Sequence, residues 1–225
     1  MTVLFVVATI TVFLAIDWFV RRAREKKGVR TPSFVQRTLE HSISVRIPEG
    51  IFFARSHTWM NLFPSGKVYL GIDDFVSRLL EHPEVILLRM AGDHVAKGDP
   101  ILLLKEDGRE LTIHAPVDGE ILAINEELPS KPELMKNLLF TDGWAYSIKP
   151  KRPSELKEMI FGEETAMWIA EEFRRLRDVF AGMSQHGELV PALLQDGGPP
   201  IAGAMKQMPV SVWNRFEREF LVVRE

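Results

Sequence analysis

Residues 101–114 read Ile-Leu-Leu-Leu-Lys-Glu-Asp-Gly-Arg-Glu-Leu-Thr-Ile-His. An apolar run at 101–104 and an alternating apolar and polar run at 111–114 flank a charged centre that contains the dipeptide Asp107-Gly108. Asp-Gly favours the two-residue type I′ turn, because both central residues of that turn need positive φ angles. The stretch therefore predicts a β-hairpin with Gly108 at its tip.

Short strand signatures extend on both sides of this hairpin. Residues 43–47 alternate apolar and polar side chains, which is typical of a half-buried strand. Turn segments such as Pro64-Ser65-Gly66 separate the later apolar runs. We expect further strands at 51–54, 67–70, 85–90, 121–124 and 144–148. Many short strands with turns every eight to twelve residues or so indicate a compact β barrel or sandwich.

Helices are expected inside this β region and after it. Asp73 can cap a short helix, and residues 134–139 suggest another. After Pro150, residues 163–180 are amphipathic, with Gly182 expected to end the helix. Residues 183–202 are rich in Gly and Pro and indicate a loop, and 212–221 are expected to form a last helix. The apolar faces are Phe75, Val76, Leu79 and Leu80; Ala166, Ile169, Phe173, Leu176 and Phe180; and Trp213, Phe216 and Phe220.

The polar face of the long helix carries one expected ion pair. Glu171 and Arg175 are four residues apart, a spacing at which opposite charges on a helix can meet.

The amino-terminal segment Thr2–Val20 is apolar apart from three threonines and Asp17. As a helix it would span roughly 28 Å, about the thickness of a bilayer core. Six Lys or Arg residues follow within 21–30 and none precedes the span. The positive-inside rule then predicts a single-pass anchor in the cytoplasmic (inner) membrane, with the amino terminus outside and the β domain in the cytoplasm.

Two other interpretations of this segment remain open. A cleaved signal peptide would place its positive charges before the apolar run and small residues after it, which is the reverse of what is seen. A buried core helix is the other alternative. With an anchor, the chain divides into a transmembrane segment at 1–22, a basic linker at 23–42, a β domain at 43–150 and a helical extension at 151–225.

Composition excludes several functional classes. The net charge is −3, and the only long basic stretch follows the apolar segment, so a nucleic-acid partner is not expected. The absence of cysteine excludes disulfides, thiolate metal sites and thiol catalysis. The six histidines lack the spacing of a metal site, and His57 and His114 are expected to satisfy local hydrogen bonds. No phosphate-binding glycine loop or nucleophile elbow is present, so we expect neither an enzyme nor a bound cofactor or metal.

Several motifs occur in order along residues 49–150. They are Ser56-His57-Thr58-Trp59, Gly71-Ile72-Asp73-Asp74-Phe75, Gly92-Asp93-His94-Val95-Ala96-Lys97-Gly98 and Gly143–Pro150. In order and spacing, this set resembles the glycine cleavage system H protein, a small carrier whose lysine holds a lipoyl arm at a hairpin tip. The resemblance implies a mainly β, lipoyl-domain-like fold (a barrel-sandwich hybrid) with two small sheets around one core.

The same resemblance implies that the carrier chemistry is missing. Counting back from the turn Pro116-Val117-Asp118-Gly119, the lipoyl lysine falls at Gly108. The acidic residue three positions earlier in the family is Lys105 here, and the glutamate that lines the arm's cleft is Thr58. A motif around Lys206 is similar to a biotin attachment site, but no alternating strands are expected around it.

Two functions of different classes follow. The first is a membrane-anchored, non-lipoylated accessory or scaffold protein that acts by binding a membrane-associated protein partner. The alternative is a lipoyl-dependent aminomethyl or acyl carrier that uses a displaced lysine such as Lys105. For the first function, the expected partner-contact residues at the hairpin tip are Lys105, Glu106, Asp107, Gly108, Arg109 and Glu110.

Overall fold

The computed structural model describes residues 50–184 and 202–223. The chain divides into two compact units, 1–33 and 34–225, and all described residues belong to the second. The expected anchor at 1–22, the linker at 23–42 and the strand at 43–47 lie outside the described residues. None of the helices within the two described ranges is both long and apolar enough to cross a bilayer.

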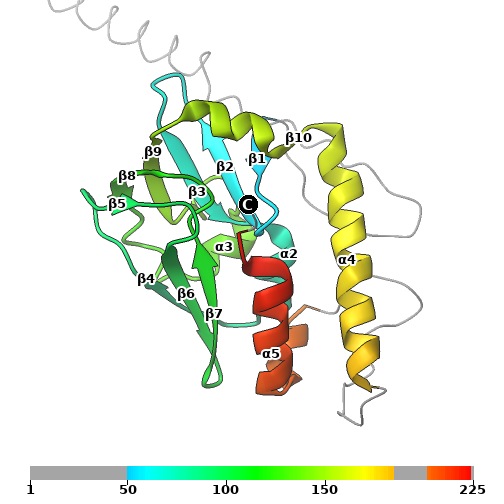
Figure 1. Cartoon of the computed structure of the whole chain (residues 1–225). Coiled ribbons are helices and arrows are strands. Elements are labelled where there is room, and N and C mark those ends of the chain that lie inside the picture. The colour runs from blue at the N-terminus through cyan, green and yellow to red at the C-terminus, as the bar shows by residue number, and fades with distance from the viewer. Residues whose placement is uncertain (1–49, 185–201, 224–225) are drawn as a thin grey trace, which may run out of the picture. The chain divides into compact units, whose positions relative to one another are not determined.

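A larger and a smaller antiparallel sheet form the β domain (Figure 1). Each buries one face against a shared apolar core that includes Trp59, Leu104 and Tyr146. The two-sheet, mainly β architecture expected from the sequence is therefore confirmed. In spatial order the larger sheet contains β10 (Ile160–Phe161), β1 (Ile51–Phe53), β2 (Thr58–Leu62), β3 (Val68–Ile72), β9 (Tyr146–Pro150), β8 (Gly119–Ile124) and β5 (His94–Val95).

The smaller sheet contains the predicted hairpin. Its order is β4 (Glu84–Leu87), β6 (Pro100–Glu106) and β7 (Arg109–His114), so β7 is an outer strand. The hairpin register pairs Lys105 with Glu110 and Glu106 with Arg109, which leaves Asp107 and Gly108 as the two turn residues. The predicted hairpin is thus confirmed.

Helices pack on this β domain. Asp73 caps α2, because its carboxylate accepts a hydrogen bond from the Val76 amide at 3.1 Å, as predicted. Trp213, Phe216 and Phe220 are all buried, so the expected apolar face of the last helix is confirmed. The helices are α2 (Asp74–Leu79), α3 (Leu134–Asn137), α4 (Glu163–Ser184) and α5 (Val210–Phe216), with 3-10 turns η1 (Pro153–Glu158) and η2 (Ala204–Gln207) and a π-helical turn η3 (Glu217–Leu221).

Two details of α4 differ from the sequence predictions. Gly182 does not end the helix, which continues to Ser184. Arg175 does not pair with Glu171, because it binds the buried Glu172 instead, at 2.6 Å. Glu171 forms its ion pair with Arg174. The neighbour that Arg175 selects is therefore set by tertiary packing and not by helical spacing alone.

The structure contains three strands that the sequence patterns did not predict, namely β2, β5 and β10. In β2, the first three residues, Thr58, Trp59 and Met60, are all buried. This burial removes the polar alternation by which half-buried strands are recognised. β5 and β10 have only two residues each, too few to show any period.

Candidate functional site

The candidate site is the tip of the β6–β7 hairpin, and its turn has the expected backbone. Asp107 has a φ of 50° and Gly108 a φ of 75°, the pair of positive angles that a type I′ turn requires. A Cβ atom added at Gly108 would meet nothing within 4 Å. The tip is therefore sterically open, while its left-handed backbone favours glycine.

The charged residues of the tip face in two directions. Lys105 is 41% exposed and lies 3.7 Å from the Glu110 carboxylate across the hairpin. Glu106 instead points inward and is only 6% exposed. One of its oxygens accepts hydrogen bonds from the backbone amides of Glu81 at 2.8 Å and His82 at 2.5 Å. Glu106 thus fastens the hairpin to the chain after α2, and the other charged tip residues face outward.

A shallow concavity of about 420 Å³ lies beside the turn. Glu106 forms part of its lining, and its second oxygen, Oε2, is buried without a hydrogen-bond partner among the described residues. The other lining residues are His82, Glu84, Lys105, Asp107, Gly108 and Lys206. The lining carries both cationic and anionic groups, so its surface suits a polar partner with both charges.

The carboxyl-terminal segment, which we call the tail (residues 204–221), holds the hairpin along β7. Arg109 donates a hydrogen bond to the Lys206 carbonyl at 3.0 Å. The Thr112 amide on the outer side of β7 donates to the Glu217 carboxylate at 3.1 Å. In Figure 1, α5 lies alongside β7. These contacts join residues about a hundred positions apart, and no sequence pattern indicated them.

Lys206 itself belongs to the 3-10 turn η2 and not to a hairpin. Its ammonium group binds the Glu81 carboxylate at 2.5 Å. The expectation that strands do not flank this lysine is confirmed. Because Glu81 directly follows the C-cap residue of α2 in the chain, this ion pair joins the tail to the end of α2 and indicates a structural role for Lys206.

The segment Ser56–Trp59, where the resemblance places the arm's cleft, is closed. His57 and Thr58 are fully buried. The imidazole Nδ1 lies 2.7 Å from an Asp73 carboxylate oxygen, so the predicted hydrogen bond of His57 is confirmed, although its partner lies 16 residues away. For His114 the prediction is not met at Nδ1, which is buried without a hydrogen-bond partner among the described residues. Trp168 from α4 and Phe75 from α2 stack on the two faces of the ring. No open surface is left at Thr58 for a flexible arm.

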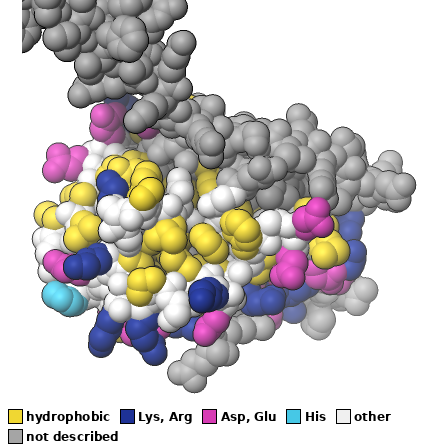
Figure 2. Space-filling model, turned by 90° about the horizontal axis from the view of Figure 1, so that it is seen from above, with side chains coloured by type: hydrophobic (Ala, Val, Ile, Leu, Met, Phe, Trp, Pro, Cys, Tyr) yellow, Lys and Arg dark blue, Asp and Glu magenta, His cyan; other side chains and the backbone are white. Residues whose placement is uncertain are grey.

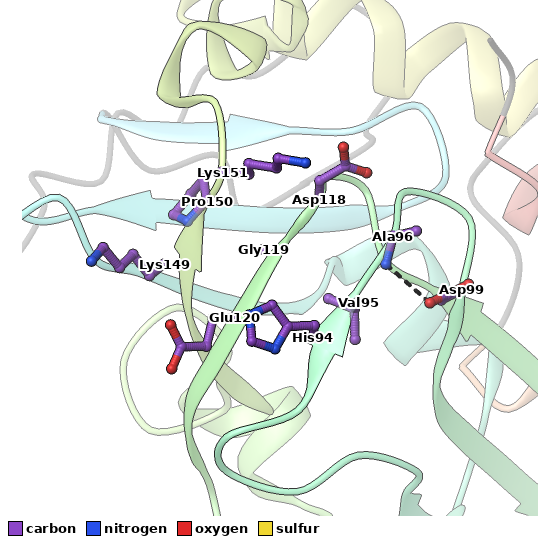
Figure 3. A pocket seen from close by; sticks show the side chains of 10 residues that line it. All are labelled: His94, Val95, Ala96, Asp99, Asp118, Gly119, Glu120, Lys149, Pro150 and Lys151. Atoms are coloured by element: carbon purple, nitrogen blue, oxygen red, sulfur yellow. Dashed lines mark hydrogen bonds between the residues drawn. The ribbon is translucent and has the colours of Figure 1, made fainter.

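A second hollow, of about 640 Å³, lies where β5, β8 and β9 run side by side (Figure 3). The register places His94, Glu120 and Lys149 in one row across the three strands. The Asp118 carboxylate accepts a hydrogen bond from the Lys97 amide, and the Asp99 carboxylate accepts one from the Ala96 amide, so both stabilise the neighbouring turns. None of the buried polar atoms that lack a partner in the described ranges lines this hollow. It is an exposed cross-strand charge row, which usually contributes little beyond solubility and strand pairing.

One face of the molecule gathers apolar side chains, with charged groups around them (Figure 2). Several large apolar residues are more than a third exposed, and an aromatic cluster forms where the Tyr69 ring stacks on Trp144 at 4.6 Å. The Lys67 ammonium lies 4.9 Å from the centre of the Tyr69 ring. Among the described residues of the β domain and the turns around it, the exposed large apolar side chains are Leu62, Leu88, Met90, Leu122, Leu138 and Phe161.

Within residues 50–184 and 202–223, no group of three or more His, Asp or Glu residues has an arrangement that could hold a metal ion. The hairpin and its surroundings also show no nucleophile held by a base. What the site offers is a rigid turn, exposed charges and a tail fastened to its side. This arrangement is suited to binding.

Comparisons with known proteins agree on one family. The family model described as "Glycine cleavage H-protein" matches residues 51–172, more than half of the chain. The chain is similar to a "Glycine cleavage system H protein" of Pseudoalteromonas translucida (strain TAC 125), with 34% identity over 126 residues, covering 56% of this chain and 98% of the relative. It is also similar to a "Probable glycine cleavage system H protein" of Pyrococcus horikoshii, with 30% identity over 55% of this chain and 92% of that relative.

Among solved structures, the crystal structure of a glycine cleavage system H protein from Mycobacterium marinum aligns with a TM-score of 0.40 and 21% identity, over 47% of this chain and 87% of that chain. The family match reaches beyond residue 150, where the sequence motifs stop, and ends at Glu172 within α4. The second half of α4 and the whole tail therefore lie outside the matched segment.

Proposed function

The chain belongs to the glycine cleavage H-protein family, and from that premise we propose that it acts by binding a protein partner without carrying a lipoyl arm. Members of the family are carriers and not catalysts. In this chain the carrier's scaffold is kept, while the residues that load and shelter the arm differ. The proposed function is that of an accessory or scaffold protein, tethered to the membrane.

The observation that carries the proposal is the hairpin tip. Gly108 occupies the position that the resemblance assigns to the lipoyl lysine, and its φ of 75° disfavours any L side chain there. Lys105 places a positive charge where a carboxylate is expected, and it is held in a cross-strand pair with Glu110. A residue on a strand projects sideways from the hairpin, so Lys105 is poorly placed to replace an apical lysine.

The buried segment and the tail support the same proposal. Thr58, which stands where the family has a cleft glutamate, is fully buried. The tail lies along β7 and binds Arg109, so one flank of the hairpin is covered. A carrier hairpin must enter the active sites of other proteins, whereas this one is fastened along its side to its own chain.

The binding surface that we propose consists of the outward-facing tip. It includes Lys105, Asp107, Gly108 and Glu110, and it excludes Glu106, whose side chain is buried. Mixed charges at the tip would set the orientation of the partner.

Intact-mass spectrometry of the native protein tests the missing arm. We expect no lipoyl adduct on the wild-type chain. The lipoylating enzyme should modify Gly108→Lys poorly, because Lys105 presents a positive charge where that enzyme expects a carboxylate. The double variant Gly108→Lys with Lys105→Glu should be lipoylated better. A lipoyl mass shift on wild-type protein, or support of glycine decarboxylation together with the other components of that system, would establish the carrier alternative.

Co-purification after crosslinking tests the binding surface. Lys105→Glu should weaken recovery of the partner, while circular dichroism stays unchanged. Lys131→Glu is the matched control, because Lys131 is an exposed lysine in an ion pair with Glu127, like Lys105 with Glu110. Equal recovery with the tip variant and the control would contradict a contact at the tip.

We also propose that Thr2–Val20 anchors the chain in the cytoplasmic membrane, with the β domain on the cytoplasmic side. The apolar length and the one-sided basic flank support this proposal. The full chain should remain in the membrane fraction after a high-salt wash, and deletion of residues 1–22 should release a folded soluble protein. Recovery of the full chain in the soluble fraction without detergent would refute the anchor.

A further inference from the structure

The side chain of His57 is completely buried between two carboxylates. Its Nδ1 lies 2.7 Å from an Asp73 oxygen, and its Nε2 lies 3.6 Å from a Glu172 oxygen. The second distance is that of an ion pair and exceeds a hydrogen bond. Asp73 precedes α2 and Glu172 belongs to α4, so one imidazole bridges the β domain to the long helix.

Aromatic rings enclose the imidazole and exclude water from it. Phe75 stacks at 4.1 Å between ring centres and Trp168 at 5.0 Å, while Phe220 of the tail approaches at 6.2 Å. His57 also has a φ of 61°, which is unusual for a residue other than glycine. A strained backbone under full burial indicates that the surroundings hold the ring in one orientation.

The charged groups continue from His57 to the tail. Glu172 binds Arg175 at 2.6 Å, and the Arg175 guanidinium lies 4.8 Å from the centre of the Phe220 ring. The same guanidinium donates to the Glu219 carbonyl at 3.2 Å. A continuous series of contacts thus runs from the cap of α2, through α4, to the tail. It is made by four buried or half-buried side chains: Asp73, His57, Glu172 and Arg175.

We propose that protonated His57 is a clasp that docks α4 and the tail onto the β domain, and that loss of its proton releases them. When the imidazole is charged, it offsets the negative charges of two buried carboxylates. When it is neutral, Glu172 keeps only Arg175 as a counter-charge in a water-excluded site, which destabilises the docked arrangement. This inference concerns the packing of the helical segments and does not rest on the proposed function.

The direction of the pH dependence follows from the surrounding groups. Burial lowers the pKa of His57, but the charge of Asp73 and its hydrogen bond to the imidazole, and then the charge of Glu172, outweigh burial and raise the net pKa above 6.5. The free energy that His57 contributes to docking is therefore fully present below about pH 6.5 and is lost as the pH rises through the folded-state pKa of His57. Burial raises the pKa of Glu172, but His57 and Arg175 outweigh it, so the net pKa lies below 4.5.

The contribution of Glu172 is therefore complete above about pH 4.5 and lost in stronger acid. The other groups against the ring, Phe75, Trp168 and Phe220, carry no charge. Docking of α4 is expected to be strongest between these two limits and to weaken on the alkaline side through His57.

Hydrogen exchange of the full-length chain in detergent tests the clasp. Protection of the α4 backbone, corrected for the intrinsic pH dependence of exchange, is measured from about pH 5 to about pH 9. Between about pH 6.5 and the folded-state pKa of His57, protection should fall by up to about tenfold per pH unit, the limit for release of one proton, and above that pKa it should level off. His57→Asn keeps a residue that tolerates the left-handed backbone but cannot be charged, so its protection should be low and independent of pH over this range.

Two adjacent glutamates on the same helix provide a matched pair. Glu172 is 6% exposed and pairs with Arg175, whereas Glu171 is 52% exposed and pairs with Arg174. Glu172→Gln should lower both the protection of α4 and the pKa of His57 measured by nitrogen NMR. Glu171→Gln should change neither.

The proposal is overturned if wild-type protection of α4 does not change while NMR shows His57 losing its proton. It is also overturned if the slope persists in His57→Asn. If that variant does not fold, the NMR titrations of the wild type and of the two glutamate variants decide the matter. Equal His57 pKa values in all three would exclude a clasp through Glu172.

Discussion

Phe216→Ala should show whether the tail is part of the folded unit or an appendage on it. The Phe216 ring is fully buried, with its centre 6.0 Å from that of Phe75 in α2 and 5.0 Å from that of Phe220. Truncating a fully buried aromatic side chain leaves a cavity and typically costs about 3–5 kcal/mol. Because Phe75 also stacks on His57, we expect the loss to reach the β domain and not only the tail.

Urea denaturation of the chain lacking residues 1–22 measures this loss as a shift of the midpoint at constant slope. Exchange of the Thr112 amide reports the tail separately, because Glu217 is its acceptor. Val210→Ala is the control, since Val210 is on the same helix and is 56% exposed, and it should change stability by no more than about 0.5 kcal/mol. If Phe216→Ala leaves the midpoint within that limit while the Thr112 amide becomes unprotected, the tail is an independent appendage and the reasoning is refuted.

Three further outcomes follow from other contacts. Gly71→Ala should destabilise the chain by about 1–3 kcal/mol in thermal melts, because the added Cβ would lie 2.8 Å from three ring atoms of the buried Trp59. Gly182→Ala should instead stabilise the chain by about 0.5–1 kcal/mol, because an added Cβ in the helix meets nothing within 4 Å. If both substitutions changed the free energy of unfolding in the same direction, the close packing of Gly71 against Trp59 would be contradicted. Burial raises the pKa of Tyr146 to about 12, so stability should be complete below pH 10 and fall by about 2–3 kcal/mol as pH rises to 12. Tyr146→Phe should abolish that fall, and an ultraviolet titration of Tyr69→Phe, which leaves Tyr146 as the remaining tyrosine, should show ionisation near pH 12 and not near 10.

Local signals predicted the local structure of this chain well. Asp107-Gly108 encodes its turn through backbone angles that few other dipeptides accept, and the structure contains that turn. Asp73 was identified as a helix cap because a cap needs only a side chain and an amide three residues later. Gly182 shows the limit of such signals, because a glycine permits the end of a helix without forcing it.

Contacts between distant residues could not be predicted in the same way. His57, Asp73 and Glu172 meet although Glu172 lies more than a hundred residues after His57, and no spacing rule connects them. The same cluster explains why Arg175 pairs with Glu172, since Glu172 is drawn toward the imidazole. Glu106 continues the inward alternation of Leu102 and Leu104, and the contact that could not be predicted is its acceptance of hydrogen bonds from the distant amides of Glu81 and His82.

The bond between Thr112 and Glu217 also has a consequence for synthesis of the chain on the ribosome. These residues are 105 positions apart, so at roughly 5–20 residues per second strand β7 exists for roughly 5–20 s before its cover is made. During that interval its outer row of backbone groups can pair with the same row of a neighbouring nascent chain. Messages that end before residue 217 should therefore yield aggregates, and chaperones that bind nascent chains should be needed most between completion of the hairpin and emergence of the tail.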